Sequence, residues 1–135
     1  MGERIVVGVD DSAGGRAALA YALHEGALRG AEVEVIGAYT VPQYWPEQAH
    51  DAGAHLEKIV AEVRAARHGD EPTAVRVQAV AGNAAAALLE AARGAQLLVV
   101  GSRGHGGFTS MLVGSVGLQC VLHAGCSVTV VRPTT

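Results

Sequence analysis

The sequence is short of charged residues, aromatic residues and cysteine. Of its 135 residues, 17% are charged, 4% are aromatic and two are cysteines. Low charge combined with a hydrophobic share of 50% excludes a disordered chain. With so few aromatics the core must be built from Ala, Val and Leu, and side chains of that size let helices lie close to a sheet. A chain of this length fits one core, so we expect residues 1–135 to form a single domain.

Features of nucleic-acid-binding and membrane proteins are missing as well. The ten basic residues are scattered in a chain of net charge −3, whereas binding to nucleic acid usually requires a basic patch. No apolar run reaches the roughly 18 residues of a membrane span, and no signal-peptide pattern is present. We therefore expect a cytoplasmic protein without nucleic-acid or membrane partners. Cys120 and Cys126 do not have a metal or redox spacing, so we expect ordinary core or surface residues and no metal site.

Five short apolar runs are present, rich in β-branched residues and bounded by Gly or Pro. Such continuous runs predict strands that are buried on both faces of a sheet. The runs are Arg4–Val9, Glu32–Tyr39, Ala74–Val80, Gln96–Gly101 and Ser127–Val131.

Helical patterns lie between these runs. Leu56, Ile59 and Val63, for example, recur at the spacing of one helix face. Alternating strands and helices predict an α/β fold: a single doubly wound domain with a five-stranded parallel sheet and helices on both faces. The stretch Thr40–Gln48 is predicted to be a loop or lid. The four helical patterns centre on residues 18–26, 56–63, 84–93 (ended by Gly94) and 115–123.

A glycine-rich segment, Gly101–Ser115, lies between the fourth predicted strand and the fourth predicted helix and reads G-S-R-G-H-G-G-F-T-S-M-L-V-G-S. Glycines let a backbone approach an anion closely, and successive N–H groups can form a concave nest for oxygen atoms. The following helix adds N–H donors and a positive dipole end, and Ser115 can cap that helix or donate to a phosphate. The segment lacks the Walker lysine, and it does not follow the first strand as a dinucleotide fingerprint does. The alternative is a flexible glycine-rich loop without a ligand.

The spacing Gly101-x2-Gly104-x9-Gly114-Ser115 resembles the G-2x-G-9x-G-S/T motif of the ATP-binding branch of the universal stress protein family. The opening V-G-V-D-D-S, the stretch G-N-A-A-A-A-L-L and the ending H-A-G-C-S-V-T-V-V-R-P also resemble the family, so the likeness covers nearly the whole chain. The departures, all outside the phosphate loop, are Ala84 in place of proline, and Gly125 and Ser127 in place of alanine or proline.

This resemblance implies the strand order 3-2-1-4-5, in which the chain reverses direction between strands one and four. Ligands of open α/β sheets bind at such a switch point, beyond the carboxyl ends of the strands. Asp10 and Gly101 stand at those two strand ends, so the residue pattern and the resemblance indicate the same crevice. Asp10 suits either a ligand contact or the capping of the first helix, for which Asp11 and Ser12 are better placed.

The resemblance also implies a ligand, ATP with or without Mg²⁺. It implies that Asp10 lies near the adenosine and that the backbone of Ala38 contacts adenine. Val9 suits either the base or the core, and Arg103 suits either phosphate or an exposed loop position. The candidate ligand-binding residues are Val9, Asp10, Ala38, Gly101, Ser102, Arg103, Gly104, Gly114, Ser115 and Val116.

Three functions fit these features. The first is an ATP-binding regulator whose nucleotide state is read by partners in a stress response, with ATP ordering the loop Ser102–Leu112. The second is a slow ATPase, or a phosphoryl or nucleotidyl transferase, in the same crevice. The third is a structural dimer with an empty crevice, against which the complete glycine spacing argues.

The enzyme hypothesis lacks a convincing base. Phosphoryl transfer needs a positioned base or water, and the nearby carboxylates in the sequence are Asp10 and Asp11. The resemblance allows slow hydrolysis, or autophosphorylation on Thr109 or Ser110. We expect a protein that is not an enzyme.

The last predicted strand, Ser127–Val131, lies at a sheet edge in the implied order. It has no lysine, no proline and no charge that would discourage pairing with another chain. This pattern predicts a homodimer in which two such edges pair antiparallel about a two-fold axis. The resemblance implies the same interface, and the alternative is a monomer whose own loop covers the edge.

Overall fold

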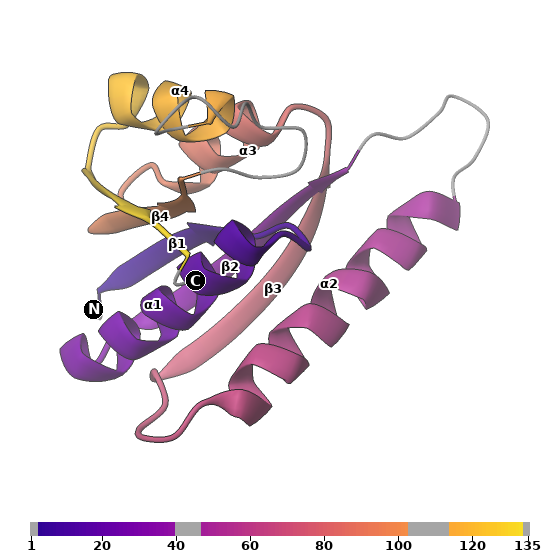
Figure 1. Cartoon of the computed structure of the whole chain (residues 1–135). Coiled ribbons are helices and arrows are strands. Elements are labelled where there is room, and N and C mark those ends of the chain that lie inside the picture. Colours follow the sequence, from indigo (N-terminus) through magenta and orange to yellow (C-terminus); the bar gives the residue numbers. More distant parts are fainter. Residues whose placement is uncertain (1–2, 40–46, 103–113, 134–135) are drawn as a thin grey trace.

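The computed structural model describes residues 3–39, 47–102 and 114–133 (Figure 1). Its strands and helices alternate along the whole chain, as predicted. The elements are β1 (Arg4–Gly8), α1 (Ala13–Arg29), β2 (Glu32–Tyr39), α2 (Glu47–Ala66), β3 (Ala74–Ala81), α3 (Ala84–Ala91), β4 (Leu97–Gly101), α4 (Ser115–His123) and β5 (Ser127–Val131).

The sheet is parallel throughout and has the order β3-β2-β1-β4-β5. The predicted α/β fold, with its doubly wound five-stranded sheet, is therefore confirmed. Strand β1 is central, and its Val7 pairs with Val35 of β2 and with Val99 of β4. The chain passes from the β3 edge to β4 on the other side of β1, so the direction of winding reverses between β1 and β4.

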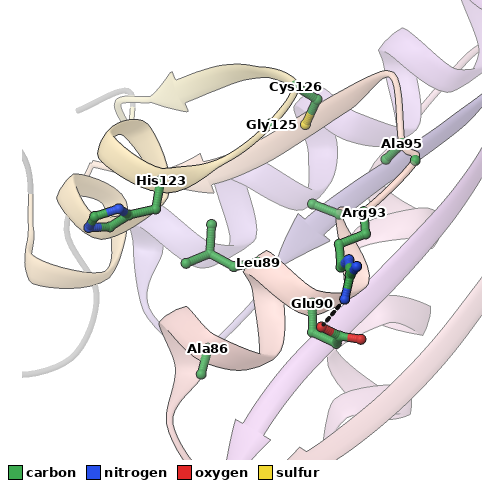
Figure 2. A pocket seen from close by; sticks show the side chains of 10 residues that line it. Ala86, Leu89, Glu90, Arg93, Ala95, His123, Gly125 and Cys126 are labelled. Atoms are coloured by element: carbon green, nitrogen blue, oxygen red, sulfur yellow. Dashed lines mark hydrogen bonds and ion pairs between the residues drawn. The ribbon is translucent and has the colours of Figure 1, made fainter.

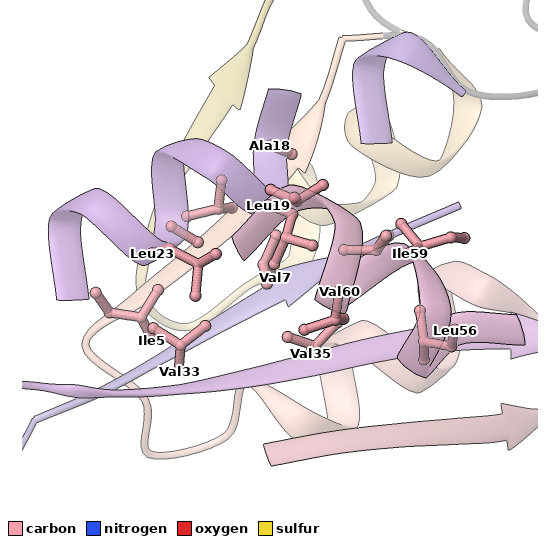
Figure 3. Packing of buried hydrophobic residues seen from close by; sticks show 14 of the residues in the cluster. Ile5, Val7, Ala18, Leu19, Leu23, Val33, Val35, Leu56, Ile59 and Val60 are labelled. Carbon is pink, nitrogen blue, oxygen red and sulfur yellow. The ribbon is translucent and has the colours of Figure 1, made fainter. Parts of the chain in front are cut away.

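Two helices cover each face of the sheet (Figure 1). Helices α1 and α2 pack on one face, and α3 and α4 on the other. Side chains along β1 alternate between the two layers, as the two-residue period of a strand requires. Ile5 and Val7 contribute to the first core with Leu19 and Leu23 of α1 (Figure 3). The second core holds Val6, Leu88, Leu98, Val100 and Cys120 among others.

The predicted helix faces are the buried ones. In α1, Ala18, Leu19, Ala22 and Leu23 are fully buried. In α2 the buried residues among those described are Leu56, Ile59, Val60 and Val63. The described residues include no helix that is long and apolar enough to span a bilayer.

The boundaries of two segments differ from the prediction by two residues, and those of β1, β3 and β4 differ by one residue. The stretch Thr40–Gln48 is not a loop to its end, because Glu47 and Gln48 are good helix formers and begin α2, while residues 40–46 lie outside the described residues. Helix α3 ends at Ala91 instead of Arg93, because the Arg93 N–H donates to the nearer carbonyl of Glu90.

Arg4 joins β1 to the end of α3. Its guanidinium donates to the carbonyl oxygens of Ala91 at 2.6 Å and Arg93 at 2.7 Å, and its backbone N–H donates to Gln96 Oε1 at 2.6 Å. The last carbonyls of a helix lack partners within the helix, so Arg4 satisfies groups that otherwise depend on water. The contact fixes the turn that leads into β4 and so brings β4 beside β1.

Candidate functional site

The switch point of the sheet lies beyond the carboxyl ends of β1 and β4. Because Val7 pairs with Val99, two further residues along each strand lead to Val9 and Gly101 at the same level of the sheet. Asp10 and Ser102 follow them directly. Ala38, near the end of β2, lies at this same end and pairs with Val80 of β3. The structure thus brings Val9, Asp10, Ala38, Gly101 and Ser102 to one end of the sheet, as predicted.

Asp10 builds the turn at the start of α1. Its Oδ1 accepts a hydrogen bond from the Ser12 backbone N–H at 3.1 Å and a second one from the Ser12 hydroxyl. Ser12 is the N-cap of α1, and its Oγ accepts from the Gly15 N–H at 3.0 Å. Asp10 therefore supports the capping residue, which is a structural role, and its contact with a ligand stays a prediction.

Gly101 is needed where β4 meets α1. A Cβ atom on Gly101 would lie 2.7 Å from the carbonyl oxygen of Gly14, and a Cβ on Gly15 would lie 2.5 Å from the carbonyl oxygen of Asp10. Real side chains do not approach a backbone atom this closely, so the first turn of α1 can lie against β4 only with glycine at position 101, and glycine at position 15 leaves room for the turn at Asp10. The sequence analysis missed Gly14 and Gly15, although two adjacent glycines one residue after a cap are an available signal.

Ser102 and Gly114 close the base of the glycine-rich segment. Among the described residues, Ser102 is the one polar residue that is almost fully buried, at 3% exposure. Its N–H donates to the carbonyl of Val131 at 2.8 Å, and its own carbonyl accepts from the N–H of Gly114. The two ends of the segment are therefore joined to each other and to the end of β5. Arg103 and Gly104 lie outside the described residues.

Helix α4 begins at this point without a side-chain cap. Gly114 is its N-cap residue and makes no side-chain hydrogen bond to the helix. The prediction that Ser115 caps α4 is wrong, because Ser115 already has helical backbone and is the first helical residue. Its side chain is exposed, while Val116 is half-buried against the second core. The first N–H groups of a helix have no partner within it, so this end can bind an anion.

Val9 and Asp11 are engaged elsewhere. Val9 is 7% exposed and belongs to the first core, so its packing role is clear and its contact with a base stays a prediction. Asp11 forms an ion pair with Arg16 at 2.7 Å, and Arg16 also contacts Glu62 of α2 at 2.9 Å. Hydrogen bonds to Asp11 and then Glu62 raise the pKa of Arg16. Arg16 thus links α1 to α2 across the surface and also holds Asp11.

A pocket of about 460 Å³ lies at the opposite end of the sheet, just before β4 and β5 (Figure 2). Leu89 and Arg93 line it from α3 and the turn after it, and His123 and Cys126 line it from the other side. Arg93 pairs with Glu90 at 3.4 Å, so its charge is already balanced. The sequence analysis did not predict this pocket, and its position separates it from the switch-point crevice.

The cysteines fit the expectation of ordinary residues. Cys120 is fully buried in the second core and Cys126 is half-buried, and both thiols are free. Burial, with a smaller effect of the Cys126 charge, raises the pKa of Cys120. Within the described part of the chain, no three His, Cys, Asp or Glu side chains gather as metal ligands do.

The fold defines the class: an open, doubly wound α/β domain, with the glycine-rich segment between β4 and α4 starting at its switch point. The sequence profile of the universal stress protein family matches residues 1–132. The chain therefore belongs to the universal stress protein family.

Two relatives illustrate the match in sequence. A universal stress protein of Mycolicibacterium smegmatis is 34% identical over 96% of this chain and 45% of its own length. Another, from Thermus aquaticus, is 34% identical over 98% of this chain and 100% of its own length. The chain spans about half the length of most of the curated relatives it matches, including the mycobacterial ones.

Solved structures agree with the fold. The universal stress protein UspA of Lactobacillus plantarum superimposes with a TM-score of 0.81 at 20% identity, covering 96% of this chain and 97% of its own. A universal stress protein in complex with cAMP has a TM-score of 0.76 at 26% identity and covers 98% of both chains. The Archaeoglobus fulgidus protein in complex with dAMP has a TM-score of 0.71 at 24% identity, covering 95% of this chain and 96% of its own.

Proposed function

We propose that this protein binds ATP and acts as a regulator whose nucleotide state is read by partners in a stress response. The observation that carries the proposal is the base of the glycine-rich segment. A backbone hydrogen bond from the Gly114 N–H to the Ser102 carbonyl joins the two residues at the switch point, directly beside the start of α4, which has no side-chain cap. The relative that is solved with cAMP at 26% identity supports an adenine nucleotide as the ligand class.

The residues at this end fit a phosphate group. The first-turn N–H groups of α4 and the exposed Ser115 hydroxyl supply donors, and Gly114 has no side chain to block them. Gly104 completes the motif in sequence, Arg103 beside it would neutralise phosphate charge, and Mg²⁺ would screen that charge further. By family resemblance Asp10, Val9 and Ala38 lie toward the adenosine.

Calorimetry with Gly114→Val tests the site. The branched side chain would occupy the space through which phosphate oxygens reach the α4 amides, so we expect ATP binding at millimolar nucleotide in the wild type and none in the variant. Gly53→Val is the matched control, because Gly53 lies in α2 with open space around it and should leave binding unchanged.

The possible results distinguish a wrong ligand from a wrong binding site. A folded wild-type protein that gives neither heat nor a thermal shift with ATP would refute the proposed function. If a folded Gly114→Val protein binds as well as the wild type, the ligand stands and the site is wrong. Circular dichroism of each variant establishes that it is folded.

The proposed function does not include catalytic turnover. The Asp10 carboxylate accepts two hydrogen bonds at the start of α1, and Asp11 is paired with Arg16, so neither is poised as a base.

The proposal further includes a cytoplasmic homodimer that forms through β5, with no nucleic-acid or membrane partner. Strand β5 lies at the edge of the sheet, as this interface requires.

A further inference from the structure

Helix α4 presents apolar side chains to solvent on the side opposite the sheet. Cys120 is fully buried in the second core, whereas Leu118 and Leu122, two residues before and after it, are 40% and 62% exposed. At 3.6 residues per turn these leucines lie roughly 160° around the helix from Cys120 and next to each other, and Val121 flanks them at 49% exposure. We call Leu118, Val121 and Leu122 the outer α4 face. Single exposed hydrophobic residues are common, whereas a contiguous set indicates an interaction surface.

The pocket between α3 and α4 borders this face. Ala86 and Leu89 of α3 line the pocket together with His123, the last residue of α4 (Figure 2). Glu90 and Arg93 pair at 3.4 Å on the α3 side, and their side chains are exposed. Protein-binding sites commonly have apolar side chains at the centre and polar ones at the rim, and the outer α4 face with this pocket has the same arrangement.

A short helical segment of a partner protein is the occupant that the size of this face favours. A stable interface between two globular copies needs roughly 20–30 residues on each side. The face offers three large apolar side chains on a helix of nine residues. A helix of that length is about 14 Å long, which suits two to three turns of a second helix. Amphipathic helices bind such faces through apolar anchors at i, i+3, i+4 and i+7.

The charge pattern favours an apolar partner over a lipid surface. From Ser115 to Val131 the sequence contains no Asp, Glu, Lys or Arg. Helices that lie on membranes carry Lys and Arg on their polar side, where anionic lipids attract them. The outer α4 face offers lipid headgroups no such contact, so it selects a partner by apolar contact and shape.

Helix α4 joins the outer α4 face to the candidate nucleotide site. Its N-cap, Gly114, donates its N–H to the carbonyl of Ser102 just after β4, and the helix ends at His123 beside the pocket. Rigid secondary-structure elements carry coupling between sites. A ligand that repositions Gly114 therefore also moves Leu118 and Leu122, which lie about one and two turns further along the same helix.

We propose that the outer α4 face binds an amphipathic helix of a partner protein, and that the partner reads the nucleotide state at this surface. The readout rests on the proposed function, whereas the surface does not. Coupling of this kind is reciprocal: if ATP tightens binding of the partner helix by some factor, the partner helix tightens ATP binding by the same factor.

The surface is tested with a synthetic peptide of about four helical turns, made of Leu, Ala, Glu and Lys, with its leucines at i, i+3, i+4 and i+7. Fluorescence polarisation should give a peptide Kd about tenfold higher for Leu122→Ser than for the wild type, because the variant loses an apolar anchor. Leu28→Ser is the matched control: it removes an exposed leucine from α1 and should leave the Kd unchanged. A peptide of the same composition with its leucines spread around the helix should bind about tenfold more weakly or worse.

Several results would overturn this surface or its occupant. Equal affinity for the two peptides, or for the wild type and Leu122→Ser, would overturn the surface. A self-association in sedimentation velocity that Leu122→Ser weakens and Leu28→Ser does not would make a second copy the occupant. Binding to phosphatidylglycerol vesicles that Leu122→Ser abolishes would make a lipid surface the occupant. Either of these two results would overturn the partner helix.

The readout is tested by measuring the peptide Kd of the wild type with and without saturating ATP. We expect the two Kd values to differ about fivefold or more. Equal Kd values in a protein that binds ATP by calorimetry would overturn the readout, while the surface and ATP binding would stand. A wild type that binds the peptide and does not bind ATP would overturn the readout together with the proposed function, while the surface would stand.

Discussion

Gly101 has two roles that a sequence motif cannot separate. In the motif it is a phosphate-loop glycine, and in the structure it also gives the start of α1 room to lie against β4. The packing role does not depend on any ligand, because the Gly14 carbonyl lies where a Cβ atom would go. A loss of ATP binding after substitution of Gly101 could therefore come from altered packing alone.

Gly101→Ala should destabilise the fold without nucleotide. A Cβ atom 2.7 Å from the carbonyl oxygen of Gly14 forces the backbone to shift, and overpacking of this kind costs about 1–3 kcal/mol. Urea unfolding of the ligand-free protein measures the loss. Gly125→Ala is the control, since nothing lies within 4 Å of its added Cβ, and it should change the free energy of unfolding by less than about 0.5 kcal/mol. Equal stability of the two variants would show that α1 does not need this close approach.

Substitution of Asp10 tests whether the protein only binds ATP or also hydrolyses it. We expect phosphate release from ATP and Mg²⁺ to be negligible beside the ~1–10³ per second of ordinary enzymes, because the Asp10 carboxylate is engaged at the start of α1. Asp10→Asn keeps an oxygen that can accept from Ser12 and should leave this low rate unchanged. A colorimetric phosphate assay measures it, with Asp11→Asn as the control. Release at several per second that disappears in Asp10→Asn alone would identify an enzyme.

At the scale of elements, helices α1 and α3 begin with a side-chain cap and helix α4 does not. Ser12 caps α1 and Asn83 caps α3, each accepting a hydrogen bond from the N–H three residues later. Helix α4 begins at Gly114, which has no side chain to do so. The two capped helices satisfy part of their own first turn, whereas Gly114 offers α4 no side-chain acceptor. This difference is consistent with a phosphate group at α4.

The sequence predicted elements well where the signal is local. β2, β5 and α4 have the predicted bounds, because each is a continuous apolar or periodic run between turn residues. The contact of Arg4 with Ala91 and Arg93 could not be predicted, because it joins residues far apart in sequence. The same holds for the pairing of Arg16 with Glu62, which depends on how α1 and α2 pack.

The location of the candidate site was predictable from the sequence, but the contacts that build it were not. The glycine spacing and the strand order were enough to bring Asp10 and Gly101 to one crevice. The packing of Gly101 on Gly14, and the hydrogen bonds from Ser102 to Val131 and from Gly114 to Ser102, required the three-dimensional arrangement. Those bonds cross between elements, and no local pattern in the sequence encodes them.

At the scale of the whole molecule, the proposed dimer depends on the β5 edge of the sheet. The backbone groups of successive strand residues point to alternate sides. Val131 points its carbonyl toward β4, where Ser102 binds it, so the N–H of Val130 points to the free edge. Val128 and Val130 already pack partly on the second core, so their side chains have little surface to offer a partner. The proposed pairing would therefore depend mainly on backbone hydrogen bonds.

Val130→Pro should convert the dimer to a monomer that remains folded. Proline removes a donor from the free edge and clashes with a pairing strand, but proline is tolerated in edge strands where the N–H faces solvent. Light scattering should give twice the 13.7 kDa chain mass for the wild type and 13.7 kDa for the variant. Thr129→Pro is the informative comparison, because the Thr129 N–H points toward β4 and its loss should lower the thermal midpoint as well. A wild-type mass of 13.7 kDa across micromolar concentrations would contradict the dimer, and a dimer that survives Val130→Pro unchanged would mean that another surface forms it.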